Sequence, residues 1–278
     1  MAGREGTRMW EDEGGDATRR RLIGWIAALV VAAAIGAGLW YRFVYAPATP
    51  APKPPAPAPA APAVSTPPPV ANPIAAEPGG NTALPALNDS DRVVEDALAG
   101  VVGHGTLESF LVPQNIVRHI VATVDNLPRH KVAVDLRPVK PTPGQTVTST
   151  QGDLTVLSEA NFDRYTPLVR AVQATDIKAL AAVYKRLYPL FQEAFEDLGY
   201  PGKYFNDRLV EVIDNLLEAP EIPAPIPLTQ PRVFYEYADA GLEARSAGQK
   251  LLIRMGPANA RAIKAKLREL RAEIVRKN

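Results

Sequence analysis

Three acidic side chains recur at helical spacing in the last third of the chain. Asp207, Glu211 and Asp214 stand at positions i, i+4 and i+7, so one side of a helix would carry all three. Such a row could bind a hard cation or supply a general acid and a general base. The competing interpretation is a solvated face, because the same helix has a core-facing side formed by Phe205, Leu209, Ile213 and Leu216. We treat the three acids as a candidate interaction face and assign no catalytic, cofactor-binding or metal-binding residue.

Other residue types that commonly do chemistry are absent or badly spaced. The chain of 278 residues has no cysteine, which excludes disulfides, thiol nucleophiles and thiolate metal sites. Its three histidines, His104, His119 and His130, are not spaced as a metal pair on one helix. No phosphate loop, GxSxG elbow, HExxH motif or calcium loop occurs. We therefore expect a protein that is not an enzyme and needs no cofactor.

Charge is distributed unevenly between two regions. Residues 190–218 carry seven acids and two bases, whereas the segment from Pro257 onward carries seven bases and two acids. Pairing between the two regions is the simplest use of this asymmetry. The alternative is that the basic face of the last helix binds an anionic envelope surface.

Apolar periodicity predicts a mainly α-helical domain. Tyr184, Tyr188, Phe191 and Phe195 share one helical face, which indicates core rather than a ligand groove. Thr175 is expected to cap the helix that carries them, and Pro189 to kink or divide it. The expected helices cover residues 91–102, about 107–112, 114–127, 176–199, 203–217, 247–255 and 257–277, and a further one capped by Ser158 and Asn161 runs to about 174.

The β structure is expected to be small and irregular. Residues 131–136 alternate like a strand, and short β-type runs flank Gly152 and Asp153 as in a hairpin. Residues 219–231 are proline-rich and predict a connection across the surface, and residues 232–238 predict a short strand.

An uncharged apolar segment precedes this domain. Residues 22–40 would span about 28 Å as a helix, close to the ~30 Å hydrocarbon core of a bilayer. Arginines at 19–21 precede the segment, and aromatic residues follow it, which predicts a transmembrane anchor at 22–45 with its N-terminus in the cytoplasm. The alternative is a signal peptide cleaved near 46–48. The anchor predicts a bacterial inner-membrane protein with a periplasmic C-terminal domain.

Small residues recur along one stripe of this segment. Gly24, Ala28, Ala32 and Gly36 lie four residues apart, a spacing that lets two transmembrane helices approach closely. This predicts a possible homodimer, although an alanine-rich helix also gives such a stripe by chance.

Composition divides the rest of the chain. Residues 1–21 mix charges with little apolar content and predict a disordered cytoplasmic tail. Residues 46–86 are rich in proline and predict an extended spacer. Residues 87–278 then form the mostly α-helical periplasmic domain.

Several segments of the domain resemble one bacterial family. NIVRHIVATVDNLPR at 115–129, RYTPLVRAV at 164–172, YPLFQEAFEDLGYPGKYFNDRLVEVIDNLL at 188–217 and SAGQKLLIRMGPANA at 246–260 are similar to the family called domain of unknown function 3014. The resemblance implies an anchored envelope protein without an established activity, so it transfers no functional residues.

Taken together, the features predict a single-pass inner-membrane protein that presents a periplasmic binding or scaffolding domain on a proline-rich spacer. An envelope protein or the cell wall is the expected partner, and nucleic acid lies in the wrong compartment. The alternative function is an envelope hydrolase that acts on cell-wall material through helix carboxylates such as Asp207 and Glu211.

Overall fold

The structure, a computed structural model, describes residues 70–74, 84–131 and 133–276. The predicted tail at 1–21, the anchor at 22–45 with Gly24, Ala28, Ala32 and Gly36, and most of the linker at 46–86 lie outside these residues. Among the helices that are described, none is both long and apolar enough to cross a bilayer.

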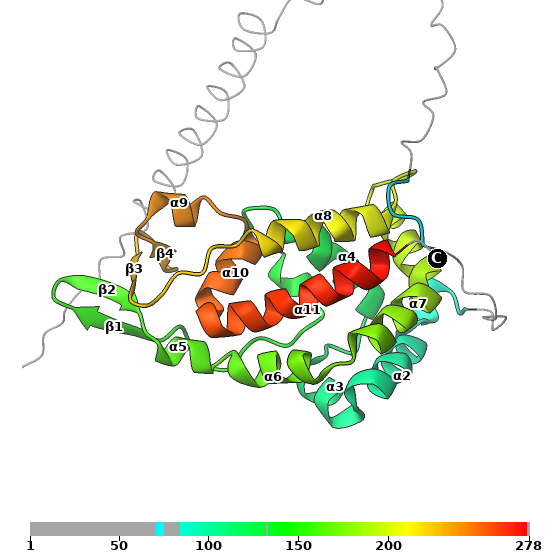
Figure 1. The fold of residues 1–278 in the computed structure, drawn as a ribbon, viewed down its shortest axis with the longest axis horizontal. Helices are drawn as coiled ribbons and strands as arrows, with labels where there is room; N and C mark the ends of the chain where they lie inside the picture. The colour runs from blue at the N-terminus through cyan, green and yellow to red at the C-terminus, as the bar shows by residue number, and fades with distance from the viewer. Residues whose placement is uncertain (1–69, 75–83, 132, 277–278) are drawn as a thin grey trace, which may run out of the picture. The chain divides into compact units, whose positions relative to one another are not determined.

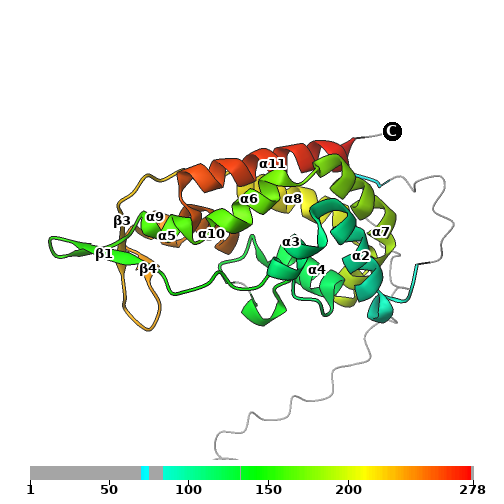
Figure 2. The same cartoon turned by 90° about the horizontal axis from the view of Figure 1, so that it is seen from below.

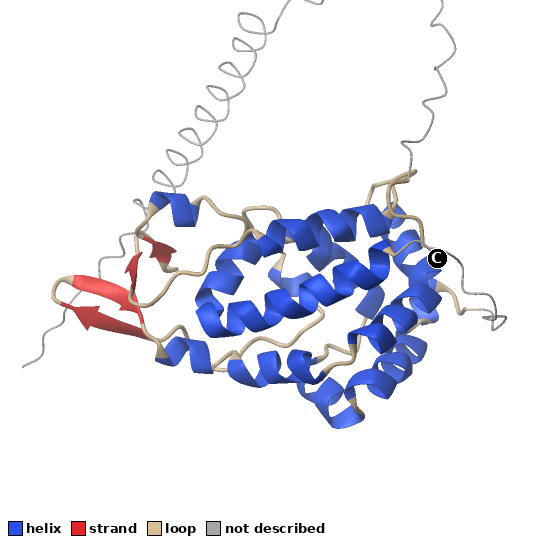
Figure 3. Ribbon diagram, in the orientation of Figure 1, coloured by secondary structure: helices blue, strands red, loops and turns tan. Residues whose placement is uncertain are grey.

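The domain is mainly helical with one small antiparallel sheet, as predicted (Figure 3). Its α-helices are α2 (Asp91–Val102), α3 (His104–Phe110), α4 (Ile116–Asn126), α5 (Ala160–Asp163), α6 (Thr166–Ala174), α7 (Ile177–Asp197), α8 (Phe205–Leu217), α9 (Ala240–Glu243), α10 (Ala247–Met255) and α11 (Pro257–Val275). Two 3-10 turns, η1 (Leu87–Asp89) and η2 (Val134–Leu136), flank the first three helices.

The main core lies among α2, α4, α7, α8 and α11. Both α4 and α11 pack against α7 and α8. The aromatic face of α7 is buried as predicted, through Tyr184, Tyr188, Phe191 and Phe195. Phe205 at the start of α8 stacks on Phe191, with ring centroids 5.9 Å apart. The aromatic residues are therefore packing elements of the domain centre.

Helix boundaries follow local capping chemistry. Ser246 caps α10 by accepting from the Gln249 amide, and Gly256 then separates α10 from α11, as predicted. The cap of α7 was predicted wrongly: it is Asp176 rather than Thr175, because the Asp176 carboxylate accepts from the amides of Lys178 and Ala179.

Two prolines act differently from one another. The helix predicted to run from the caps Ser158 and Asn161 to about 174 is interrupted between α5 and α6, where Pro167 occupies the first turn of α6 and could not continue a preceding helix. Pro189 does not divide α7, which runs through it. Pro189 is exposed, so water can reach the carbonyl group that loses its donor.

The sheet is an antiparallel meander in the order β1-β2-β3-β4. Its strands are β1 (Thr148–Gln151), β2 (Leu154–Leu157), β3 (Ile226–Thr229) and β4 (Glu236–Tyr237). The hairpin around Gly152 and Asp153 is confirmed as β1 and β2. The inner face of the sheet packs on Ile253 of α10.

The other β predictions need correction. Residues 131–136 form no strand where the structure describes them, and η2 occupies 134–136 instead. The predicted surface connection at 219–231 contains β3, whose Ile226 and Leu228 are buried while Pro227 between them is exposed. Proline suppressed the strand signal here, although the alternation of side chains is that of a half-buried strand. The predicted strand at 232–238 shortens to β4.

Two ends of the domain can be distinguished in Figures 1 and 2. The sheet lies at one end, and the C-terminal end of α11 lies at the other. We call residues 70–74 the strap, because they are hydrogen-bonded to α8 near the end of α11. We call these two regions the sheet end and the strap end.

Candidate functional site

Asp207, the first predicted site residue, fastens the strap to the domain. It occupies the first turn of α8, where a negative charge is favourable. One carboxylate oxygen accepts from the Asn72 amide at 2.7 Å and from the Asn72 side-chain nitrogen at 3.0 Å. The other accepts from the Ala71 amide at 3.1 Å. Part of the predicted linker is therefore held against the helical domain.

Asn206 joins the strap to three helices. The residue is 0% exposed, and its side-chain nitrogen donates to the Asn72 carbonyl oxygen at 2.9 Å and to the Ile274 carbonyl oxygen at 3.2 Å. Its side-chain oxygen accepts from the Tyr184 hydroxyl at 3.1 Å. Burial, together with the nearby Tyr188 and Tyr204, raises the pKa of Tyr184 well above its ordinary value, so the hydroxyl stays protonated and donates.

Two neighbouring groups complete this hydrogen-bond network. The Ile74 amide donates to the Tyr204 hydroxyl at 3.0 Å. The Tyr188 hydroxyl accepts from the Asn206 amide at 3.3 Å and donates to Gln192 at 2.9 Å. The polar groups named here are all partnered, as the structure of a buried network requires.

Glu211, the second predicted residue, belongs to a different network. It pairs with Arg208 at 2.8 Å, and Arg208 also donates to Asp125 at 3.1 Å. Asp125 is 3% exposed and further accepts from Arg129 and from the Tyr200 hydroxyl. Desolvation lowers the pKa of Arg208, but Glu211 and Asp125 outweigh it and raise this pKa above its ordinary value.

The sequence analysis did not identify Asp125, although its position on an apolar stripe could have indicated it. It follows Val117 and Val121 at four-residue spacing on the apolar stripe of α4. An acid on such a stripe is buried with the stripe and requires cationic partners. Arg208 and Arg129 supply them.

Asp214, the third predicted residue, serves helix packing. Its two oxygens accept from Arg271 of α11 at 2.6 and 2.9 Å, a bidentate ion pair that links α8 to α11. The hydrogen bonds to Asp214 raise the pKa of Arg271. The predicted pairing between the acidic region and the basic C-terminal segment is confirmed at this position.

The structure brings two of the three predicted acids to one cavity. Asp207 and Glu211 line a hollow of about 530 Å³ beside the turn between α7 and α8, and Asp214 is not among its lining residues. Lys203 and Tyr200 line the same hollow, with the Lys203 ammonium 5.3 Å from the centre of the Tyr200 ring. Both acids are already bound by donors, so the cavity presents a satisfied polar wall rather than a free acid–base pair.

No cluster of three or more His, Asp or Glu side chains suited to a metal occurs in the described ranges.

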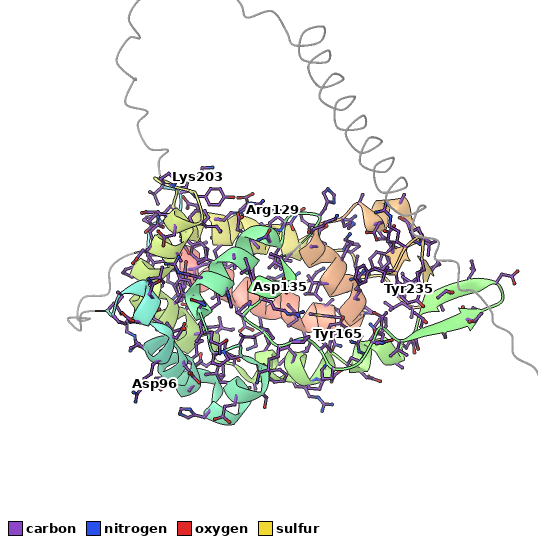
Figure 4. All side chains as sticks on the ribbon, turned by 180° about the vertical axis from the view of Figure 1, so that it is seen from behind. Asp96, Arg129, Asp135, Tyr165, Lys203 and Tyr235 are labelled. Carbon is purple, nitrogen blue, oxygen red and sulfur yellow. The ribbon has the colours of Figure 1, made fainter. Side chains whose placement is uncertain are left out.

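The sheet end has the opposite character. Val233 and Phe234, in the connection between β3 and β4, are 78% and 81% exposed, and Leu154 at the start of β2 is 57% exposed. Figure 4 shows Tyr235 of this connection and Lys203 of the strap-end cavity at opposite ends of the domain. The sequence pattern placed Val233 and Phe234 in a strand and gave no sign of their exposure.

The fold defines a helical domain with a small sheet at one end. The model of the family described as Protein of unknown function (DUF3014) matches residues 116–271, which is more than half of the chain, and the chain belongs to this family. The match begins at α4 and ends within α11, so the strap and α2 lie outside it. No curated protein and no solved structure matches the chain.

Proposed function

We propose that the chain is a single-pass bacterial inner-membrane protein that holds a non-enzymatic binding or scaffolding domain on the periplasmic side. The apolar segment at 22–40 would supply the anchor and the proline-rich tract the spacer. The family match is compatible with this function and assigns no activity.

The observation that carries the proposal is the fastening of the strap to α8. Ala71, Asn72 and Ile74 donate backbone hydrogen bonds to Asp207 and Tyr204, so the spacer joins the domain at a fixed place. This place lies at the end opposite the sheet (Figure 1). A tether fixed at one place leaves the rest of the domain surface available to a partner, for which an envelope protein or the cell wall is our first expectation.

The carboxylates favour binding over hydrolysis. Inverting glycosidases use one carboxyl group as general acid and the other as general base, and retaining ones use one as acid–base and the other as nucleophile, so both carboxyl groups must be free to reach substrate or water. Asp207 accepts three hydrogen bonds from the strap, and Glu211 is paired with Arg208. These acids therefore have structural partners that a catalytic cycle would have to displace.

Topology is tested first. A periplasm-active reporter fused after Asn278 of the full-length protein should be active, and a cytoplasm-active reporter at the same position should be inactive. The reverse pattern would overturn the anchored, periplasmic arrangement.

Catalysis is tested with membranes that contain the full-length protein. Incubation with purified cell-wall sacculi should release no soluble fragments above the background of membranes without the protein. Release that disappears in Glu211→Gln but persists in Asp214→Asn would overturn the non-enzymatic function, because only Glu211 of these two lines the cavity.

A partner is tested by crosslinking in cells, followed by mass spectrometry. One dominant envelope component that is also captured by the Glu211→Gln variant supports a scaffold. Capture that requires an intact Glu211 would instead favour substrate binding by the cavity.

A further inference from the structure

The exposed apolar side chains of the sheet end belong to two neighbouring turns. Thr155 pairs with Leu228, so the start of β2 lies next to the end of β3. The β1–β2 turn and the β3–β4 connection consequently lie at the same edge of the sheet. Leu154 and the connection that carries Val233 and Phe234 therefore belong to the same end of the sheet, and we call these three residues the apolar rim.

Folding does not account for the exposure of the rim. The inner face of the sheet is closed by Ile226, Leu228 and Tyr237, which pack with Ile253 of α10. The rim side chains are not part of this cluster, and their exposure leaves most of their apolar surface in water. Single exposed apolar residues are ordinary, but three at one end of a small sheet make that end a candidate contact surface.

The turns that carry the rim project from the domain. Figure 2 shows the β1–β2 hairpin and the β3–β4 connection projecting beyond the helices, the hairpin to the left and the connection downward, so that a flat surface could touch both. A folded protein partner usually needs a complementary surface of about 800 Å² on each side, which three side chains on projecting turns do not provide. A lipid bilayer accepts convex apolar projections without a complementary shape.

We propose that the apolar rim inserts into the interfacial region of the bilayer in which the chain is anchored. Val233, Phe234 and Leu154 supply the apolar surface, and exposed Arg232 beside them supplies a donor for lipid phosphate. Asp153 is exposed next to Leu154, which keeps this turn at headgroup depth. This inference depends on the proposed membrane anchor.

The spacer is long enough for this contact. With the rim on the bilayer, the strap end points away, and the spacer must return along the domain. The 19 residues of α11 and the four-residue strands beyond it suggest a domain length of roughly 40–50 Å. Residues 46–69 reach roughly 75 Å when extended at about 3.1 Å per residue. Tethering also keeps the rim at high local concentration, so a weak insertion is sufficient.

The test places one environment-sensitive fluorophore on the rim. The chain has no cysteine, so Val233→Cys gives a single labelling site in the full-length protein. The labelled protein is reconstituted into vesicles of phosphatidylethanolamine and phosphatidylglycerol. We expect a blue shift of its emission and quenching by brominated lipid, neither of which should occur for a label at Asp96→Cys, an exposed site on α2.

Further variants test whether the apolar side chains and the spacer length cause the quenching. Leu154→Ser with Phe234→Ser should reduce the quenching of the label at position 233 to the level of the Asp96→Cys control. The matched change Leu251→Ser, at a residue 39% exposed on α10, should leave the quenching unchanged. Deletion of residues 49–61 shortens the spacer to roughly 35 Å and should also abolish the quenching.

Failure of the rim and failure of the anchor give different results. A label that stays in water while protease protection shows the anchor inserted overturns the rim contact and leaves the proposed function intact. An anchor that does not insert overturns the proposed function itself. A blue shift without lipid quenching, seen only after another protein is added, overturns lipid in favour of a protein partner.

Discussion

The strap end and the sheet end solve opposite problems. At the strap end, polar groups such as Asn206 and Asp125 are buried, and ions or hydrogen bonds surround them. At the sheet end, Phe234 and Val233 are apolar and lie in water. Buried polar groups cost free energy unless they are partnered, whereas exposed apolar groups add nothing to folding. Changes at these buried polar groups should therefore report on stability, and changes at Val233 and Phe234 on binding.

The largest effect is expected from Asn206→Ala. This change leaves the Tyr184 hydroxyl and the Ile274 carbonyl group buried without their partner. We expect the free energy of unfolding to fall by about 2–4 kcal/mol, measured by urea denaturation. Asn88→Ala, at an exposed residue with one hydrogen bond to Arg118, should cost less than about 0.5 kcal/mol. Equal losses in the two variants would remove the contrast between buried and exposed amides.

A smaller effect is expected from Asp207→Ala, which removes the acceptor for the strap. The loss should be about 1–2 kcal/mol, because the groups set free are partly exposed and can bind water. Hydrogen exchange of the Ala71 and Asn72 amides should accelerate, while exchange in the core of α7 stays slow. Glu211→Gln is the control on the same helix, and unchanged exchange at Asn72 in Asp207→Ala would show that the bonds of Asn206 and Tyr204 hold the strap without Asp207.

A pH dependence is expected at the sheet end. Burial raises the pKa of Glu243. The hydrogen bonds from Lys250 and the Tyr237 amide, together with the nearby charges, lower this pKa by a larger amount, so the net shift is downward from 4.5. A lowered pKa in the folded protein adds stability above the ordinary pKa, and this stability is lost as the pH falls through the folded value. Lys250→Gln should remove about 1 kcal/mol or less of this stability near neutral pH, and the stability of the variant should fall less steeply as the pH is lowered. Urea midpoints across the acid range, with Glu269→Gln as the exposed control, measure the difference.

The smallest change in stability is expected from Phe234→Ser. The Phe234 side chain does not belong to the buried apolar cluster on the inner face of the sheet, so the free energy of unfolding should change by less than about 0.5 kcal/mol. Its effect should appear in lipid contact alone. A loss above about 1 kcal/mol, on the order of a core truncation, would show that Phe234 packs in the folded protein and would abolish the contrast between the two ends.

The parts of the fold that the sequence could predict are those set by local residue patterns. Helix periodicity identified the buried face of α7, and Ser246 and Gly256 marked the ends of α10. The strand β3 was hidden because Pro225 and Pro227 resemble a loop, although Ile226 and Leu228 alternate with them.

The three acids were correctly grouped on one helix, but their partners lie far away in the chain. Asp207 binds residues more than 130 positions earlier, and Asp214 binds Arg271 57 positions later. Such partners depend on how the helices pack, which no local pattern contains.

The strap also sets how the domain would respond to tension. A pull along the spacer would load the hydrogen bonds of Ala71, Asn72 and Ile74 before it reached the first buried core residue, Leu87. Once those bonds broke, residues 70–86 could reach a total span of at most roughly 55–60 Å. This extra length would absorb movement between the membrane and whatever the domain holds while α2 to α11 stayed folded. The strap would thus act as a reserve of length that yields before the helical domain unfolds, and its hydrogen bonds to Asp207, Tyr204 and Asn206 would set the force at which it yields.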